Sequence, residues 1–284
     1  METSLERQVR AAPESGSGWY EALARTGIVA KGVSYGIVAV LAIELAAGLG
    51  GKAESREGAL ATLADESFGK VLLVLLAMGF AAYAVWRFVQ AVAERNDEDD
   101  GAKGEAKTWG KRAGYVGRGL IYAALTYSTI RLLTGSHEQQ SQSEKAKHTT
   151  ATVLDWPAGR WLVAAAGIVL VGAGAWNVYR GVAKKFEEKW TEPRSGPDRP
   201  WGRRAGVVGH IARGVVFGLI GVFLVKAAVE FDPKEAIGID GALRKLADAP
   251  QGPYLLGLTA AGLLCYALYC LVDARYRDVS ANRS

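Results

Sequence analysis

Long, nearly charge-free stretches alternate along the chain with short polar segments. Each stretch has about the 20 residues that a helix needs to cross the hydrocarbon core of a membrane, which is roughly 30 Å thick. A soluble helix would carry polar side chains at every turn because one face meets water, and a membrane-spanning strand would be only about ten residues long. The pattern therefore predicts an all-α integral membrane protein. Its six transmembrane helices are expected at about residues 28–48, 70–92, 113–134, 160–182, 206–229 and 253–274.

One motif occurs three times, at the start of the first, third and fifth stretches. It reads GIVAKGVSY from Gly27, GYVGRGLIY from Gly114 and GHIARGVVF from Gly209. A repeat of roughly 90 residues indicates tandem units, and units with two spans each enter the membrane from the same side. We expect three parallel helical hairpins, either around a pseudo-threefold axis or packed less regularly. The expected divisions are a tail at 1–22, repeats at 23–95, 109–186 and 201–277, linkers at 96–108 and 187–200, and a tail at 278–284.

The segments between the two spans of a repeat are too short and polar to cross a membrane. The sequence Gly-Ala-Leu at Gly58 returns at Gly241, whereas the middle repeat has His148-Thr149-Thr150 in that place. Leucines and alanines recur at helical spacing over 58–68, which favours a short helix in the outer membrane interface over a plain loop. The Ser-, Gln- and Lys-rich segment 136–150 is expected to be mobile.

Lysine and arginine are concentrated in the two tails and in the two linkers between repeats. By the positive-inside rule, both termini are expected in the cytoplasm. The first 22 residues lack the apolar centre of a cleavable signal peptide, so the first span should itself direct insertion. The net charge of +5 follows from this bias, and attraction to anionic lipid headgroups explains it without a nucleic-acid partner.

Charged residues within the apolar stretches are candidate functional residues because charge is costly in a bilayer. One basic residue lies in each copy of the motif, and an aromatic residue follows four positions later on the same helix face. The cations either snorkel to the phosphates of lipid headgroups or form a basic ring that binds an anion, and a cation–aromatic contact could hold each charge. These residues are Lys31 with Tyr35, Arg118 with Tyr122, and Arg213 with Phe217.

A second set of charges, Glu44, Arg131 and Lys226, follows the first set by thirteen residues in each repeat. The uncharged helix between the two sets is about 18 Å long, which is shorter than the hydrocarbon core. This outer charge layer either lies in water at the outer interface or takes part in ion passage, with Glu44 neutralising one of the bases.

Small residues four positions apart predict close helix contacts. Apolar helices gain little from burial in lipid, so approach of their backbones through small residues drives packing. Hinging is the alternative role for these residues. The glycines concerned are Gly32, Gly36, Gly119, Gly214 and Gly218.

Signatures of enzymes and metal sites are mostly absent from the sequence. His137-Glu138 begins like a zinc-protease helix, but the second histidine does not follow. Cys265 and Cys270 lie five residues apart on one helix and point in different directions. We therefore expect a protein that is not an enzyme and that holds no cofactor or metal.

The tripled motif, the Gly-Ala-Leu element and the second spans that carry Trp86 and Trp176 resemble the bacterial membrane family catalogued as domain of unknown function 1206. The resemblance covers roughly residues 22–277. It implies a multipass protein of the bacterial cytoplasmic membrane, built from tandem two-helix units, and it implies no particular activity.

Two functional hypotheses remain open at this point. The first is a channel, transporter or solute-binding bundle for a small ion or solute, in which the charged residues line a path. The second is a structural or accessory scaffold, in which the charges anchor lipid headgroups or a partner protein. Charges that face the inside of the bundle favour the first, and charges that face lipid favour the second.

Overall fold

The computed structural model describes residues 18–49, 53–64, 69–93, 101–134, 141–190 and 199–278. The long elements in these ranges are α-helices, which agrees with the predicted all-α class. They are α2 (Gly18–Ala46), α4 (Gly69–Ala93), α5 (Gly101–Leu133), α7 (Gly159–Val182), α8 (Arg199–Glu230) and α10 (Gly252–Tyr276).

Five of these helices, all except α5, are long and apolar enough to cross a membrane. The first turns of α5 carry lysines and a glutamate, and Arg118 and Arg131 interrupt its apolar part. The described residues therefore give five candidate spans where six were predicted. Helix α5 also begins at Gly101, inside the stretch 96–108 that was predicted to be a linker, because alanine, lysine and glutamate all favour helix.

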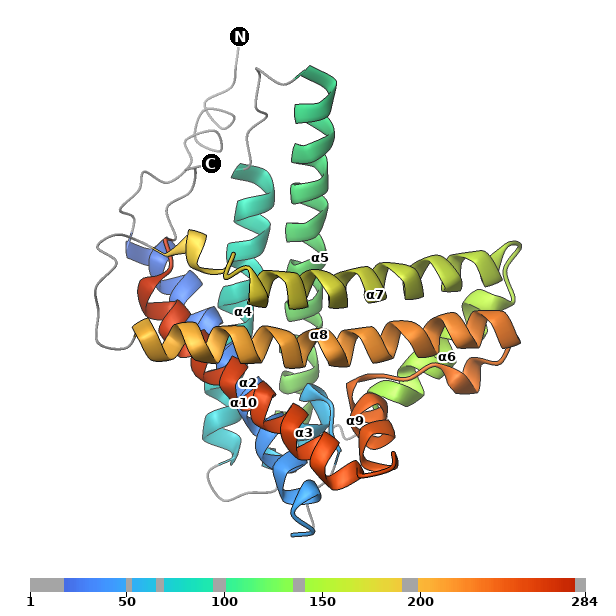
Figure 1. Ribbon diagram of the computed structural model, residues 1–284. Helices are drawn as coiled ribbons and strands as arrows, with labels where there is room; N and C mark the ends of the chain where they lie inside the picture. The colour runs from blue at the N-terminus through green and yellow to red at the C-terminus, as the bar shows by residue number, and fades with distance from the viewer. Residues whose placement is uncertain are drawn as a thin grey trace.

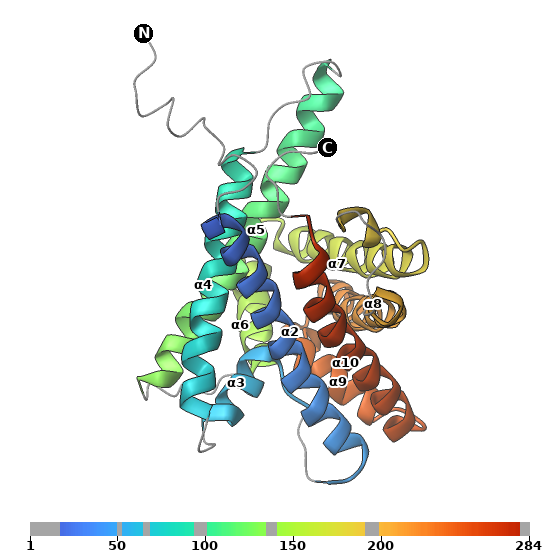
Figure 2. The ribbon, with the colours of Figure 1, turned by 90° about the vertical axis from the view of Figure 1, so that its left-hand side faces the viewer.

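The long helices pack in the spatial order α5, α4, α2, α10, α8 and α7. Figure 1 shows α7 and α8 side by side, running across the direction of α4 and α5. Figure 2 shows α2 and α10 together between these two pairs. Within the described ranges, α5 and α7 share no extended packing, so the two long helices of the middle repeat lie apart and the described helices form an open series.

The closest pair, α7 and α8, is joined by glycines. A Cβ atom added at Gly174 would lie 2.8 Å from the backbone oxygen of Gly214 and 2.8 Å from the backbone nitrogen of Gly218. At Gly221, a Cβ atom would lie 2.6 Å from the backbone nitrogen of Val171. The two backbones are thus in direct contact, as expected where small residues drive association in lipid.

A short helix lies between the two long helices of each repeat. These short helices are α3 (Arg56–Ala64), α6 (Gln142–Leu154) and α9 (Ile239–Ala247); the 3-10 turns η2 (Glu187–Lys189) and η3 (Pro233–Glu235) lie after α7 and before α9. Helix α6 corrects the expectation that 136–150 is mobile. Its first turn is stabilised by a capping box between Ser141 and Glu144, and residues 135–140 lie outside the described ranges.

Helix α6 contacts both of the other short helices through hydrogen bonds and an ion pair. The carboxylate of Asp240, on α9, accepts a hydrogen bond from the backbone N–H of Ser143 over 3.1 Å. In return, the hydroxyl of Ser143 accepts from the N–H of Gly238 over 2.9 Å, so the N-termini of α6 and α9 cap each other. Lys145 of α6 pairs with Glu57 of α3. The middle repeat therefore makes polar contacts with both of its neighbours.

Candidate functional site

Two of the predicted basic residues contact one buried tyrosine inside the bundle. The ammonium of Lys31, near the middle of α2, lies 4.9 Å from the ring centroid of Tyr266 on α10. The guanidinium of Arg213, near the middle of α8, lies 5.1 Å from the same centroid. Arg213 also donates a hydrogen bond from Nη1 to the Tyr266 hydroxyl over 2.9 Å. Both cations thus reach the interior from different helices.

A third cation, Arg56, joins them from the start of α3. Its guanidinium lies 5.2 Å from the ring of Tyr35 and 5.6 Å from the ring of Tyr122, and its Nη1 donates to the Tyr122 hydroxyl over 3.4 Å. The ring of Tyr35 also lies 5.7 Å from the guanidinium of Arg213. We call this group the central cluster. Its members are Lys31, Arg56, Arg213, Tyr35, Tyr122 and Tyr266.

The central cluster carries three positive charges, and no ion pair among the described residues joins any of them to a carboxylate. The faces of the tyrosine rings attract the cations, but neutral rings do not remove the charge. The Nε atoms of Arg56 and Arg213 are buried and have no hydrogen-bond partner within the described ranges. Desolvated charge without a counter-charge is costly, so the chemistry of this group favours an anion as its complement.

A largely buried arginine, Arg277, shows how the same bundle neutralises a charge. Asp273, near the end of α10, accepts from the Nε of Arg277 over 3.0 Å and from the indole nitrogen of Trp190 over 3.0 Å. Burial alone would lower the pKa of Arg277, but the carboxylate of Asp273 raises it above its ordinary value. This group is a neutral contact between the end of α10 and the segment after α7, whereas the central cluster keeps its positive charge.

Arg118, the remaining residue of the predicted basic ring, is exposed on α5 and lies outside the central cluster. The next residue, Gly119, faces α4, and a Cβ atom added there would lie 2.7 Å from Cε1 of Phe88. Arg56 instead supplies the third charge. The sequence gives no signal for Arg56, because it lies in a polar segment and the matching residue of the third repeat is Ile239.

The outer charge layer has a different environment. Lys226 is exposed and pairs with Glu235 over 3.0 Å and with Glu230 over 3.8 Å. Glu44 and Arg131 are partly buried in the last turns of α2 and α5. Lys226 thus has its own carboxylate partners near the end of α8.

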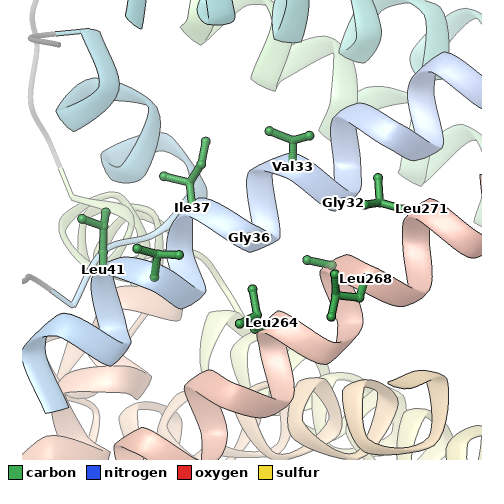
Figure 3. Close-up of a pocket in the computed structure, with 10 residues that line it drawn as sticks. Gly32, Val33, Gly36, Ile37, Leu41, Leu264, Leu268 and Leu271 are labelled. Carbon is green, nitrogen blue, oxygen red and sulfur yellow. The ribbon is translucent and has the colours of Figure 1, made fainter. Parts of the chain in front are cut away.

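The remaining predicted glycines lie where α2 approaches α10. A Cβ atom at Gly32 would lie 2.9 Å from the Cβ of Cys270, and one at Gly36 would lie 3.6 Å from the Cβ of Ala267. Beside them, an apolar groove of about 410 Å³ runs between the two helices, lined by side chains that include Ile37 and Leu264 (Figure 3). This groove is lined by apolar residues and is separate from the central cluster.

Comparison with known proteins places the chain in a family. A family model described as Domain of Unknown Function (DUF1206) matches residues 26–94, 113–184 and 208–277. The chain belongs to this family. Each DUF1206 match falls on one pair of long helices, α2 with α4, α5 with α7, and α8 with α10.

A curated relative is similar over nearly its whole length. The Uncharacterized protein YxxB of Bacillus subtilis (strain 168) is 28% identical over 264 residues, which cover 92% of this chain and 93% of that protein. No solved structure matches the chain. Among the described residues, no group of histidine, cysteine, aspartate and glutamate could hold a metal ion. The central cluster, with three cations in contact with tyrosines, is the candidate site of this DUF1206 protein.

Proposed function

We propose that this DUF1206 protein binds a small anion between its helices and conducts or transports it across the membrane. The observation that supports the proposal is the central cluster, in which Lys31, Arg56 and Arg213 contact tyrosines and no carboxylate of the described residues. Intramembrane cations that face the inside of a bundle mark ion or substrate pathways more often than lipid contacts.

The proposal includes a placement in the membrane. In it, α5 is the sixth span, because it packs extensively against the apolar helix α4, and the protein forms three two-helix repeats in a bacterial inner membrane. Both termini lie in the cytoplasm, as the distribution of lysine and arginine predicts. Arg56 then reaches the central cluster from the outer side, because α3 connects the outer ends of α2 and α4.

The residue types in the central cluster suit the reversible binding of an anion. Guanidinium groups present fixed forks of N–H donors and are more weakly hydrated than ammonium. Tyrosine hydroxyls can donate to the anion or accept from an arginine. The arginines of this site also donate hydrogen bonds to tyrosine hydroxyls, so an anion must compete with the tyrosines for these donors and binds less tightly. Conduction needs binding that is weak enough for release.

Reconstitution in liposomes tests this proposal. We expect efflux of iodide, nitrate or inorganic phosphate above that of empty liposomes, without a matching efflux of potassium. Arg56→Gln and Arg213→Gln should each slow the efflux about tenfold, since each removes a charge interaction worth about 1.4 kcal/mol in the barrier. Lys226→Gln is the matched control, because Lys226 is exposed and has carboxylate partners, and it should conduct like the wild type.

Two outcomes of this experiment would contradict the proposal. One is an anion efflux that neither arginine variant changes. The other is no efflux from protein that is shown to be folded, which would favour the scaffold hypothesis. One observation supports that alternative. In the apolar stretch of 18 residues within α7, only 17% of the residues are buried, which leaves a broad helix face for a partner protein or lipid.

A further inference from the structure

A second buried cation lies next to the central cluster, in contact with three aromatic rings. Arg87, near the end of α4, is 7% exposed. Its guanidinium lies 4.3 Å from the ring of Trp86, 4.7 Å from the ring of Tyr83 and 5.8 Å from the ring of Tyr115. It donates to the side-chain oxygen of Gln90 over 2.7 Å and to the hydroxyl of Tyr83. Among the described residues, none of these partners is a carboxylate, so Arg87 also lacks an acidic counter-charge.

Polar groups without partners gather around this cation. The Nε of Arg87, the indole nitrogen of Trp86 and the hydroxyl of Tyr20 are all buried, and none of them makes a hydrogen bond of good geometry in the described part of the chain, although Trp86 and Gln90 lie near the Tyr20 hydroxyl. Trp86 is 1% exposed and Tyr20 is 4% exposed. The rings of Tyr20 and Trp86 lie 6.5 Å apart, and those of Tyr83 and Trp86 lie 5.4 Å apart. These residues thus form one contiguous aromatic group around Arg87.

The chemistry of these groups indicates an acceptor with negative charge. An indole nitrogen and an arginine Nε can only donate hydrogen bonds, and a buried donor without an acceptor is unfavourable. An anion would accept from all three groups and would also neutralise Arg87. A cation or an apolar ligand would satisfy none of the donors.

A pair of tyrosines connects this group to the central cluster. The rings of Tyr83 and Tyr122 lie 4.3 Å apart. The hydroxyl of Tyr83 accepts from Arg87, and the hydroxyl of Tyr122 accepts from Arg56. An arginine therefore lies on each side of one tyrosine pair, with Arg87 on the side of the C-terminal end of α4.

We propose that Arg87, Trp86 and Tyr20 form a second anion subsite, which passes the anion between the cytoplasmic end of the bundle and the central cluster. This inference rests on the proposed function, because it names a second position on the same route. Several weak sites in series allow an ion to move by exchange instead of being held at one position. The tyrosine pair of Tyr83 and Tyr122 is then the barrier between the two positions.

Iodide binding to the full-length protein in detergent tests the subsite, with radioactive iodide measured by equilibrium dialysis. We expect two classes of iodide site in the wild type. Arg87→Gln should remove one class, and Arg213→Gln should remove the other. Tyr20→Phe deletes the hydroxyl and keeps the ring, and Trp86→Phe deletes the indole N–H and keeps an aromatic side chain, so each should weaken the first class about tenfold. Tyr179→Phe is the control, since Tyr179 is exposed on α7.

The outcomes separate the subsite from the proposed function. Loss of a class of site in Arg87→Gln, or its weakening in Trp86→Phe and Tyr20→Phe, supports the subsite even if Arg213→Gln binds normally. A single class that only Arg213→Gln removes overturns the subsite and leaves the proposed function standing. If Arg87→Gln does not fold, unchanged binding in both Trp86→Phe and Tyr20→Phe overturns the subsite. No iodide binding to the folded wild type overturns both proposals.

Discussion

The glycine contact between α7 and α8 allows a controlled test of how this bundle is held together. Gly174→Ala adds one methyl group at a position where its Cβ atom would lie 2.8 Å from the backbone oxygen of Gly214 and 3.1 Å from the Cα of Gly218. Carbon atoms prefer separations of about 3.5–4.0 Å. The neighbouring atoms belong to a backbone and cannot rotate away, so the two helices must separate. Gly172→Ala, two residues earlier on the same helix, meets nothing within 4 Å.

The difference between these two variants isolates the helix contact. Replacing glycine with alanine within a helix gains about 1 kcal/mol of helix propensity in both variants, and this gain cancels in the comparison. Overpacking at Gly174 costs about 1–3 kcal/mol. We therefore expect Gly174→Ala to be less stable than Gly172→Ala by about 1–3 kcal/mol, which is a factor of about 5 to 150 in the unfolding equilibrium.

Reversible unfolding in mixed micelles, with increasing fractions of sodium dodecyl sulfate, measures this free energy for both variants under one condition. Wild-type protein and Gly172→Ala set the reference. Equal stability of Gly174→Ala and Gly172→Ala would refute the argument, because it would mean that the backbones of α7 and α8 are not in contact at Gly174. If the backbones are not in contact, the larger Gly174→Leu variant should also fold. We expect instead that Gly174→Leu prevents assembly of the bundle.

Two further predictions concern charged groups, and thermal melting in detergent checks both. Asp273→Asn leaves Arg277 buried without its counter-charge and should destabilise the fold by about 3–5 kcal/mol; a melting temperature like that of the wild type would show that this pair is not buried. Lys145→Ala breaks only a partly exposed pair with Glu57 and should change stability by less than about 1 kcal/mol, so a large loss would show that α3 depends on α6 for its position.

The sequence predicts the long helices well because lipid imposes a strong constraint on composition. Runs of about 20 apolar residues predict helices, and α2, α4, α7, α8 and α10 occupy those positions. Hydropathy does not predict the start of α5, since Gly101 lies in a charged segment. Helix α6 was missed for the same reason, although Ser141 and Glu144 have the spacing of a capping box.

The candidate site could be predicted only in part. Lys31, Tyr35 and Arg213 stand out because the motif repeats them in an apolar context. Arg56 and Arg118 could not be assigned correctly, because repetition alone places Arg118 in a ring and gives no reason to bring Arg56 inward. The environment of each residue depends on how α3 and α5 pack against other helices, and periodicity within one helix carries no information about that.

The open order of the helices has a consequence for biosynthesis. Helix α7 leaves the ribosome before its glycine-contact partner α8 exists, and α2, the first helix made, packs along α10, the last. When only two repeats have been made, α2 and α7 therefore lack their partners α10 and α8, and one face of each helix remains exposed to lipid. The bundle cannot assemble fully until the C-terminal helix α10 has been made. Truncations near the C-terminus should therefore destabilise the fold as strongly as defects in the first helix, and membrane quality control should recognise both.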